Sequence, residues 1–221
     1  MIALIIVLFF GGLMFYASYS IKSNVYVKAF CKKETSEKVV AITFDDGPDA
    51  VQTLKILDVL KEYNVQACFF CIGSRVENNK ELIQRMVREG HLIGNHSYSH
   101  TNSFPLYGKH KMSYDLRLCQ QKLEEASQEK ITFFRPPFGV TNPTIGSLVK
   151  KMDFTVIGWS IRSLDTLQSS PEKVLRRVRR QLHPGAVILL HDVLPQSEVL
   201  LKMILELLAD KGYTIKRVDL M

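Results

Sequence analysis

Short apolar runs alternate with longer amphipathic segments along most of the chain. Short apolar runs between turn residues are typical of buried strands, and apolar positions three and four apart are typical of helices. The pattern predicts strands over residues 39–43, 66–72, 91–95, 132–134, 155–158, 186–190 and 214–218. It predicts helices over residues 51–63, 77–89, 113–128, 143–152, 171–182 and 196–210, with Ser113 as a start and Gly212 as a stop. Such repeated strand–helix units imply an α/β fold with parallel strands and right-handed crossovers.

Polar side chains at the ends of the predicted strands help to choose between two architectures. Parallel strands of this number form either an open, doubly wound sheet or a closed barrel. Charged or imidazole side chains stand at or just beyond the C-terminal ends of several strands, at Asp45, Asp46, His96, Arg135, Asp165 and His191. Because (β/α) barrels carry their sites at that end, we expect a barrel.

The first 21 residues form a separate region. Residues 1–21 contain no charged side chain and are mostly Ile, Leu, Val, Phe and Met, about the length that crosses a bilayer as a helix. A buried core helix is the alternative, but the position at the N-terminal end favours a transmembrane anchor. No basic stretch precedes the apolar run and no clean cleavage site follows it, although Ser18 and Ser20 are small residues at a suitable spacing. We therefore expect an uncleaved anchor, a basic linker over 22–37 and one domain over 38–221.

Composition excludes few classes of protein. The 221 residues are 46% hydrophobic and 23% charged, which is ordinary for a globular domain, and no internal repeat is visible. The net charge of +7 suits an anionic wall polymer or a lipid surface. No basic–aromatic motif of a nucleic-acid-binding module is present, so we expect no nucleic acid as a partner. The densest basic segment, residues 176–180, is expected to be a solvated helix face, with contact to a membrane surface or acidic substrate as the alternative.

The four cysteines give no disulfide framework. Cys68 and Cys71 form a C-F-F-C pattern inside a predicted strand, where residues three apart point to opposite faces. We therefore expect buried core cysteines and not a redox pair. Cys31 and Cys119 lie far from them in the sequence.

Two short segments supply the parts of a metal-dependent hydrolase. Residues 43–48 read TFDDGP and place two adjacent carboxylates after a strand, and residues 95–100 read NHSYSH and offer two imidazoles four residues apart. Alone, the first is typical of a turn and the second of two structural histidines. Together, two histidines and one carboxylate form a ligand set that leaves coordination positions for water and substrate. The remaining carboxylate can accept a proton from that water.

Three later segments complete a resemblance to a known family. They are RPPFG at residues 135–139, Leu164-Asp165, and VILLHD at residues 187–192. With the first two segments, and in the same order, they resemble the five motifs of the polysaccharide deacetylase family, also called the NodB-homology family or carbohydrate esterase family 4. The resemblance runs from Val39 to Val218. It implies an irregular (β/α)7 barrel, and the apolar segment before it would add an N-terminal transmembrane helix.

The resemblance implies a role for each motif residue. Three of them match the metal ligands of the family, namely Asp46, His96 and His100. Two imidazoles and one carboxylate suit a divalent ion, with zinc expected. Asp45 matches the general base, and Arg135 would orient it and keep it ionised.

The proton donor and the substrate pocket are implied in the same way. His191 matches the acid that protonates the leaving amine, and Asp165 matches the carboxylate that holds His191 charged. The backbone N–H of Phe138 would stabilise the oxyanion. Leu189 either lines a slot for the acetyl methyl group or is ordinary core.

The fourth motif departs from the common family pattern. Thr166 occupies the position of a Trp that often walls the acetyl pocket, and Arg162 replaces an acidic residue. Trp159, the only Trp of the chain, is expected in the core. A changed pocket wall alters substrate preference before it alters chemistry.

Three functions remain open at this point. The leading expectation is a membrane-anchored, metal-dependent deacetylase acting on N-acetylated sugars of an envelope glycan such as peptidoglycan. An O-acetyl esterase or a deformylase of a lipid-linked sugar would use the same site, and an inactive glycan-binding domain is the third possibility. Four lysines follow the apolar segment, and by the positive-inside rule they favour the cytoplasm as the location of the catalytic domain. They are Lys22, Lys28, Lys32 and Lys33. The resemblance favours the outer face, which we expect for the catalytic domain.

Overall fold

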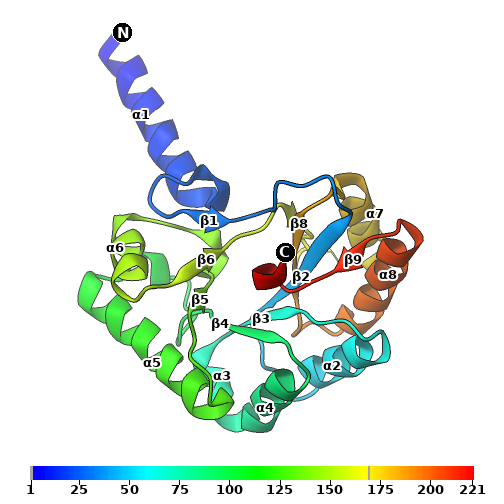
Figure 1. The fold of residues 1–221 in the computed structure, drawn as a ribbon. Coiled ribbons are helices and arrows are strands. Elements are labelled where there is room, and N and C mark those ends of the chain that lie inside the picture. The colour runs from blue at the N-terminus through cyan, green and yellow to red at the C-terminus, as the bar shows by residue number, and fades with distance from the viewer. Residues whose placement is uncertain (1, 169) are drawn as a thin grey trace.

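A curled sheet of parallel strands, surrounded by helices, forms the body of the molecule, and one helix projects from it (Figure 1). The computed structural model describes residues 2–168 and 170–221, with side chains from Gly11 onward. The strands are β1 Ala29–Phe30, β2 Val39–Asp45, β3 Cys68–Cys71, β4 Leu92–Asn95, β5 Phe133–Phe134, β6 Thr155–Ile157, β7 Ile161–Arg162, β8 Ala186–His191 and β9 Thr214–Ile215. The α-helices are α1 Ile2–Tyr19, α2 Gln52–Glu62, α3 Gly73–Val76, α4 Lys80–Arg88, α5 Lys109–Ser127, α6 Pro143–Lys151, α7 Pro171–Gln181 and α8 Ser197–Asp210.

The sheet curls far enough for its two edges to approach each other. The strand order is β1-β6-β5-β4-β3-β2-β8-β7, every paired strand is parallel, and β9 adds to β2. An antiparallel bridge joins Lys32 to Ala186, and the Ser160 N–H donates to the Val187 carbonyl. This arrangement is consistent with the predicted irregular (β/α) barrel, and each of the seven predicted strands is present.

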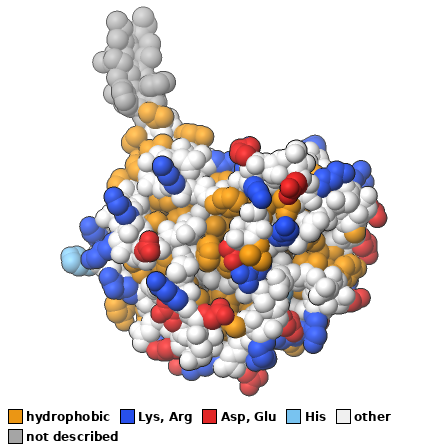
Figure 2. All heavy atoms as spheres, in the orientation of Figure 1, with side chains coloured by type: hydrophobic (Ala, Val, Ile, Leu, Met, Phe, Trp, Pro, Cys, Tyr) orange, Lys and Arg blue, Asp and Glu red, His pale blue; other side chains and the backbone are white. Residues whose placement is uncertain are grey.

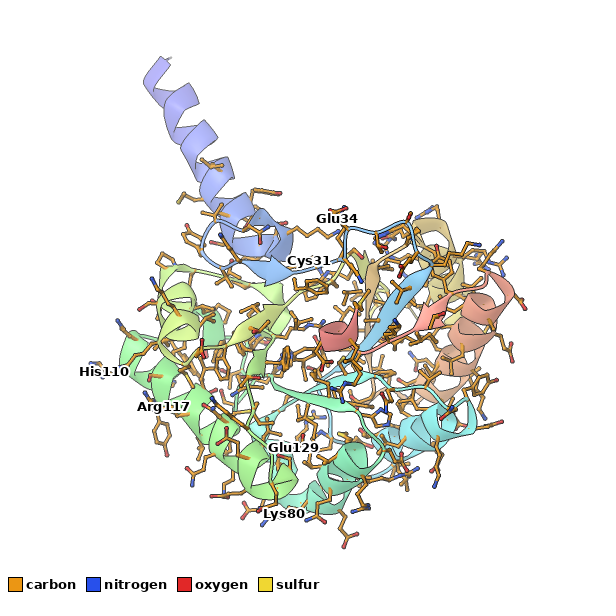
Figure 3. The ribbon with its side chains drawn as sticks, viewed as in Figure 1. Cys31, Glu34, Lys80, His110, Arg117 and Glu129 are labelled. Carbon is orange, nitrogen blue, oxygen red and sulfur yellow. The ribbon has the colours of Figure 1, made fainter. Side chains whose placement is uncertain are left out.

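Two short strands were not predicted. β1 lies within the segment 22–37 that was expected to be a linker, and it pairs with β6. Ile21 and Val27 are buried beside it, so this segment packs as part of the barrel. Cys31 and Glu34, labelled in Figure 3, mark its course from β1 towards β2. β1 and β7 have two residues each, too few to show a hydrophobic period of their own, whereas the equally short β5 follows the apolar residue Ile131 in a longer run.

The helix ends test two of the predicted signals. Helix α5 begins at Lys109 after the extended residue Gly108, so the prediction of Ser113 as its cap is wrong. Ser113 lies in the second turn, where a cap is not needed. Gly212 follows α8 with φ of +70°, which confirms the predicted stop, because a left-handed residue after a helix is favoured by glycine.

Alternation along the central strands decides which side chains enter the barrel. On β2, Val40, Ile42 and Phe44 join the core cluster between the sheet and the helices. Ala41 belongs to the cluster inside the barrel, and the same alternation places Asp45 inward at the C-terminal end of the strand. On β3, Cys68 and Cys71 are buried in these two different clusters, which confirms the prediction of core cysteines.

The membrane prediction concerns the projecting helix. Among the residues whose side chains are described, no helix is both long enough and apolar enough to cross a membrane. The predicted anchor over residues 1–21 includes the first ten side chains, which lie outside the described part of the structure. The anchor therefore stays a prediction.

Candidate active site

A cavity of about 210 Å³ lies at the C-terminal ends of the strands. Eight of the ten predicted site residues line it, namely Asp45, Asp46, His96, His100, Phe138, Thr166, Leu189 and His191. The other two, Arg135 and Asp165, lie directly behind it as partners of Asp45 and His191. Segments far apart in the sequence thus meet at one end of the barrel.

Asp46, His96 and His100 form the candidate metal centre. One ligand atom from each lies within 4.8 Å of the other two. Oδ1 of Asp46 is 3.6 Å from Nε2 of His96 and 3.4 Å from Nε2 of His100. The His96 Nδ1 is 2.8 Å from the carbonyl oxygen of Arg135, which assigns the proton to Nδ1 and leaves the Nε2 lone pair directed at the cavity. Nε2 of His100 is buried without a hydrogen-bond partner among the described residues, so this donor set fits a divalent cation.

Left-handed backbone residues aim these ligands. Asp46 has φ of 79° and His100 has φ of 44°, so the chain turns sharply where each side chain enters the cavity. The buried carboxylate of Asp115, on helix α5, accepts hydrogen bonds from the backbone N–H groups of Tyr98 and Ser99 at 2.7 and 3.1 Å. The loop between the two histidines is therefore held from behind by a helix.

Asp45 lies beside the ligand triad and is held by Arg135. Nη1 of the fully buried Arg135 donates to Oδ1 of Asp45 at 2.7 Å and to Thr43 at 2.8 Å. Burial raises the pKa of Asp45, and the Arg135 charge opposes that shift without cancelling it. The expectation that Arg135 keeps Asp45 ionised therefore describes only the smaller of two effects. A cation in the neighbouring triad would act in the same direction as Arg135.

His191 and Asp165 form a second charged pair across the cavity. The His191 Nδ1 lies 2.8 Å from Oδ1 of Asp165, and the His191 backbone N–H donates to Oδ2 at 2.8 Å. Burial alone would lower the pKa of His191, but the hydrogen bond and charge of Asp165, with the charges of Asp45 and Asp46, raise it to about 9. His191 is therefore a cation at neutral pH, with its Nε2 4.0 Å from Oδ2 of Asp46.

The remaining wall of the cavity is largely apolar. Phe138 has φ of 60°, and its ring centroid is 4.8 Å from that of His100. Leu189 is buried in a core cluster and also lines the cavity, and its place in a slot for the acetyl methyl group stays a prediction. Thr166 is exposed at the rim, and its N–H donates to Asp165.

Sequence reasoning missed part of this wall. Trp159, expected in the core, is buried but also lines the cavity, together with Gly139, Arg162 and Leu164. A Cβ on Gly139 would lie 2.4 Å from the Trp159 ring, so this glycine allows the indole to approach. The position of Trp159 just after β6 matched the pattern of the other site residues and was the available signal. No sequence signal pointed to Asp115.

Comparisons with known proteins place these observations in a family. Residues 32–157 match the family described as polysaccharide deacetylase. The chain is 36% identical over 191 residues to the peptidoglycan-N-acetylmuramic acid deacetylase PdaC of Bacillus subtilis, covering 85% of this chain and 40% of the relative. A solved structure of PdaC matches with a TM-score of 0.77 and 34% identity, over 83% of this chain and 89% of that one.

Two further relatives differ from each other in activity. A peptidoglycan-N-acetylglucosamine deacetylase of Bacillus cereus is 35% identical over 163 residues, covering 71% of this chain and 74% of the relative. The structure of BA3943 of Bacillus anthracis, a CE4 family pseudoenzyme, matches with a TM-score of 0.79 and 26% identity, over 87% of this chain and 68% of that one.

Proposed function

The chain belongs to the polysaccharide deacetylase family, and from that premise we propose that it is a metal-dependent hydrolase that removes N-acetyl groups from amino sugars of an envelope glycan such as peptidoglycan. The observation that carries the proposal is the convergence of three metal-ligating side chains with a separate carboxylate and a separate charged imidazole around one cavity. A glycan-binding domain needs neither of the last two groups. The peptidoglycan deacetylases among the relatives support this class of substrate.

The proposed metal ligands are Asp46, His96 and His100, and zinc is the proposed ion. Bound there, a divalent ion supplies a Lewis acid that polarises the acyl carbonyl and lowers the pKa of water. The protein fixes this site by two devices. The Arg135 carbonyl sets the tautomer of His96, and Asp115 holds the loop that carries His100.

Asp45 is the proposed general base. Its Oδ2 is 3.7 Å from Nε2 of His96, so it lies next to the triad while its Oδ1 is held by Arg135. In this position it can accept the proton of an attacking water molecule. Arg135 is a positioning residue, because its guanidinium contacts Asp45, Thr43 and two backbone carbonyls at Ile157 and Gly158.

His191 is the proposed general acid. It carries the proton that the leaving amine needs, and Asp165 orients the ring through Nδ1 so that Nε2 faces the cavity. The backbone N–H of Phe138 is the proposed donor to the developing oxyanion. Leu189 and Thr166 are proposed to contact the acyl group.

The cellular context is also a proposal. We place the N-terminal segment, residues 1–21, in the membrane as an uncleaved anchor, with residues 38–221 as the deacetylase domain on the outer face. The length and apolar composition of that segment support the anchor. On the outer face of the membrane, the domain would have access to an envelope glycan.

Acetate release by the purified protein, residues 1–221, tests the proposed function. The zinc-loaded protein is incubated with peptidoglycan fragments and with chitooligosaccharides, and acetate and formate are both quantified. We expect acetate release that Asp45→Asn abolishes. Formate in place of acetate would favour the deformylase, and metal binding without any release would favour the inactive glycan-binding domain.

A further inference from the structure

Asp192 is a buried carboxylate that the proposed mechanism does not use. It directly follows His191 at the end of β8 and is 1% exposed. Acidic side chains are usually exposed, and several lie on the surface shown in Figure 2. Oδ1 of Asp192 is buried without a hydrogen-bond partner among the described residues. A buried polar atom without a partner costs folding free energy, so stability alone does not account for this residue.

The carboxylate of Asp192 lies against the turn that follows Asp46, one of the proposed metal ligands. A Cβ on Gly47 would overlap Oδ2 of Asp192 and would lie 2.7 Å from its Oδ1 and 2.8 Å from its Cγ. The φ of Gly47 is not positive, so the backbone at this position does not itself require glycine. All three nearest atoms to such a Cβ belong to the carboxyl group, so it is Asp192 that requires glycine at position 47.

The pairing of two strands explains why Asp192 meets this turn. β2 and β8 are parallel neighbours, and Asp45 pairs in register with His191. Asp46 follows the first of these residues and Asp192 follows the second, so the two chains leave the sheet side by side. The segment that carries a proposed metal ligand therefore lies against the segment that follows the proposed general acid.

A short chain of hydrogen bonds fixes the carboxylate in this position. The buried hydroxyl of Thr53, in the first turn of α2, donates to Oδ2 of Asp192 at 2.6 Å. The same hydroxyl oxygen accepts the backbone N–H of Asp49 at 2.8 Å. The Asp49 carboxylate already accepts two backbone N–H groups at the start of the helix, so α2 does not need Asp192 as a cap. Asp192 is thus tied to both ends of the segment between β2 and α2.

We propose that Asp192 is a positioning residue that holds the turn after Asp46 and so fixes this metal ligand beside the general acid His191. The inference rests on the proposed function, because it takes the role of each of these residues from it. Asp46 has a left-handed backbone with φ of 79°, a conformation that persists only where the surroundings impose it. Asp192 packs on one side of the turn, and the Ile72 N–H holds the Gly47 carbonyl on another, at 2.8 Å. Without Asp192, the turn can shift towards β8 and carry the ligand out of place.

Metal binding by Asp192 variants tests the proposal separately from catalysis. Cobalt is bound to the protein of residues 1–221, its affinity is measured by competition with a chelator, and its visible spectrum reports the ligand geometry. In Asp192→Ala, we expect the affinity to fall by about 10–100-fold, the range typical of groups behind metal ligands, and the spectrum to change. Asp192→Asn keeps the shape and can accept the Thr53 hydrogen bond, so its affinity should stay within about twofold of the wild-type value. Asp210→Ala, on an exposed helix end, is the control and should change neither quantity.

An added methyl group tests the contact between Asp192 and the turn. Gly47→Ala should lower cobalt affinity by about tenfold or more when Asp192 is present, because the new Cβ overlaps the carboxylate. In the Asp192→Ala background the overlapping atoms are gone, so the same substitution should lower the affinity by less than about twofold. Thr53→Val frees the carboxylate without removing it and should change the cobalt spectrum in the same direction as Asp192→Ala. This variant decides the question if Asp192→Ala does not fold.

A wild-type affinity and spectrum in Asp192→Ala would overturn the proposal, and so would a Gly47→Ala penalty that is the same in both backgrounds. An equal loss in Asp192→Asn and Asp192→Ala would also overturn it, because the charge of Asp192 and not its shape would then matter. A lower unfolding temperature with an unchanged cobalt spectrum would make Asp192 a structural residue only. Acetate release is measured separately. If the wild-type protein binds cobalt and releases no acetate, the proposed function fails while the cobalt results on Asp192 stay interpretable.

Discussion

His96 and His191 face each other across one cavity, and each follows or ends an apolar strand, yet their surroundings differ in one decisive respect. Nδ1 of His96 faces a neutral carbonyl oxygen of Arg135, whereas Nδ1 of His191 faces the carboxylate of Asp165. Burial, with the nearby His100, lowers the pKa of His96 to about 3. At His191, the carboxylates outweigh burial and raise the pKa to about 9.

The comparison shows how a fold assigns two roles to one residue type. A neutral imidazole with its proton fixed on Nδ1 presents a lone pair at Nε2, as a metal ligand requires. A charged imidazole presents a proton at the same atom, as a general acid requires. The acceptor behind the ring therefore sets the chemistry at its front, and substitutions on the two sides should fail in different ways.

The largest effects are expected on the ligand side of the cavity, which is formed by Asp46, His96 and His100. His96→Ala and His100→Ala should lose both metal and activity, because each removes one of three ligands. Asp45→Asn should abolish activity and keep the metal, since a base can be removed without emptying the site. Metal content by plasma emission spectroscopy and acetate release distinguish the two classes.

His110→Ala is the matched control for the histidine variants. His110 is exposed on the outside of α5, labelled in Figure 3, and its loss should change neither quantity. If Asp45→Asn lost the metal while Asp46→Asn kept it, the roles of the two carboxylates would be reversed.

The next largest effect is expected on the acid side of the cavity, which is formed by His191 and Asp165. His191→Ala should lower the rate on an N-acetyl sugar by roughly 10²–10⁴-fold while metal binding is kept. An aryl acetate should suffer far less, because its phenolate leaves without a proton. An equal fractional loss on both substrates would make His191 a structural residue and would remove the contrast with His96.

The sequence did not predict the ligand side and the acid side of the cavity equally well. Long apolar runs located every central strand to within a few residues, and the position of Asp45 and His191 directly after two of these runs predicted that they lie at the barrel's C-terminal end. β1 escaped prediction because two residues carry no period. The pairing of Asp165 with His191 followed from family resemblance.

Contacts that depend on packing between distant elements were not predictable. Asp115 reaches the histidine loop only because α5 packs against β4 and the segment after it, and no local pattern encodes that approach. The apolar character of Trp159 predicts a core residue, and Trp159 is buried, but it also lines the cavity, where Gly139 leaves room for the indole ring. When a residue both packs in the core and lines a cavity, its sequence position predicts only the core packing.

Thr166 offers a smaller test on the acid side, since its N–H donates to Asp165. If Thr166 leaves the acyl pocket open, the wild-type protein should accept propionyl as well as acetyl groups. Thr166→Trp should then favour acetyl by about 1–3 kcal/mol, the usual worth of such a pocket change. Acetate and propionate release from matched substrates measures the ratio, and an unchanged ratio would show that Thr166 does not contact the acyl group.

Asp115→Asn tests the support of the ligand side. The carboxylate accepts two backbone N–H groups, from Tyr98 and Ser99, and an amide oxygen with its NH₂ can accept only one of them. Metal affinity should fall by about 10–100-fold, the range typical of outer-shell partners. Competition with a chelator and the visible spectrum of the cobalt-loaded protein report it, and Asp210→Asn, on an exposed helix end, should change neither.

The smallest effect at neutral pH, and the sharpest test of the comparison, is expected from Asp165→Asn, which gives His191 a neutral acceptor like that of His96. The raised pKa of His191 keeps the acid protonated until the pH passes about 9, so the wild-type alkaline limb should fall there. Removing the carboxylate that contributes most to raising this pKa should move the limb to lower pH, towards the ordinary histidine value of about 6.5.

The rate at pH 7 would then fall by only about fourfold, because about a quarter of the imidazole stays protonated. The same linkage makes His191 stabilise the folded state fully below about pH 6.5 and lose that contribution as the pH rises through about 9, so the variant should lose the most stability near and below pH 6.5 and little above pH 9. An alkaline limb that stays near 9 in Asp165→Asn, with metal content unchanged, would show that the acceptor behind the ring does not set the role of His191.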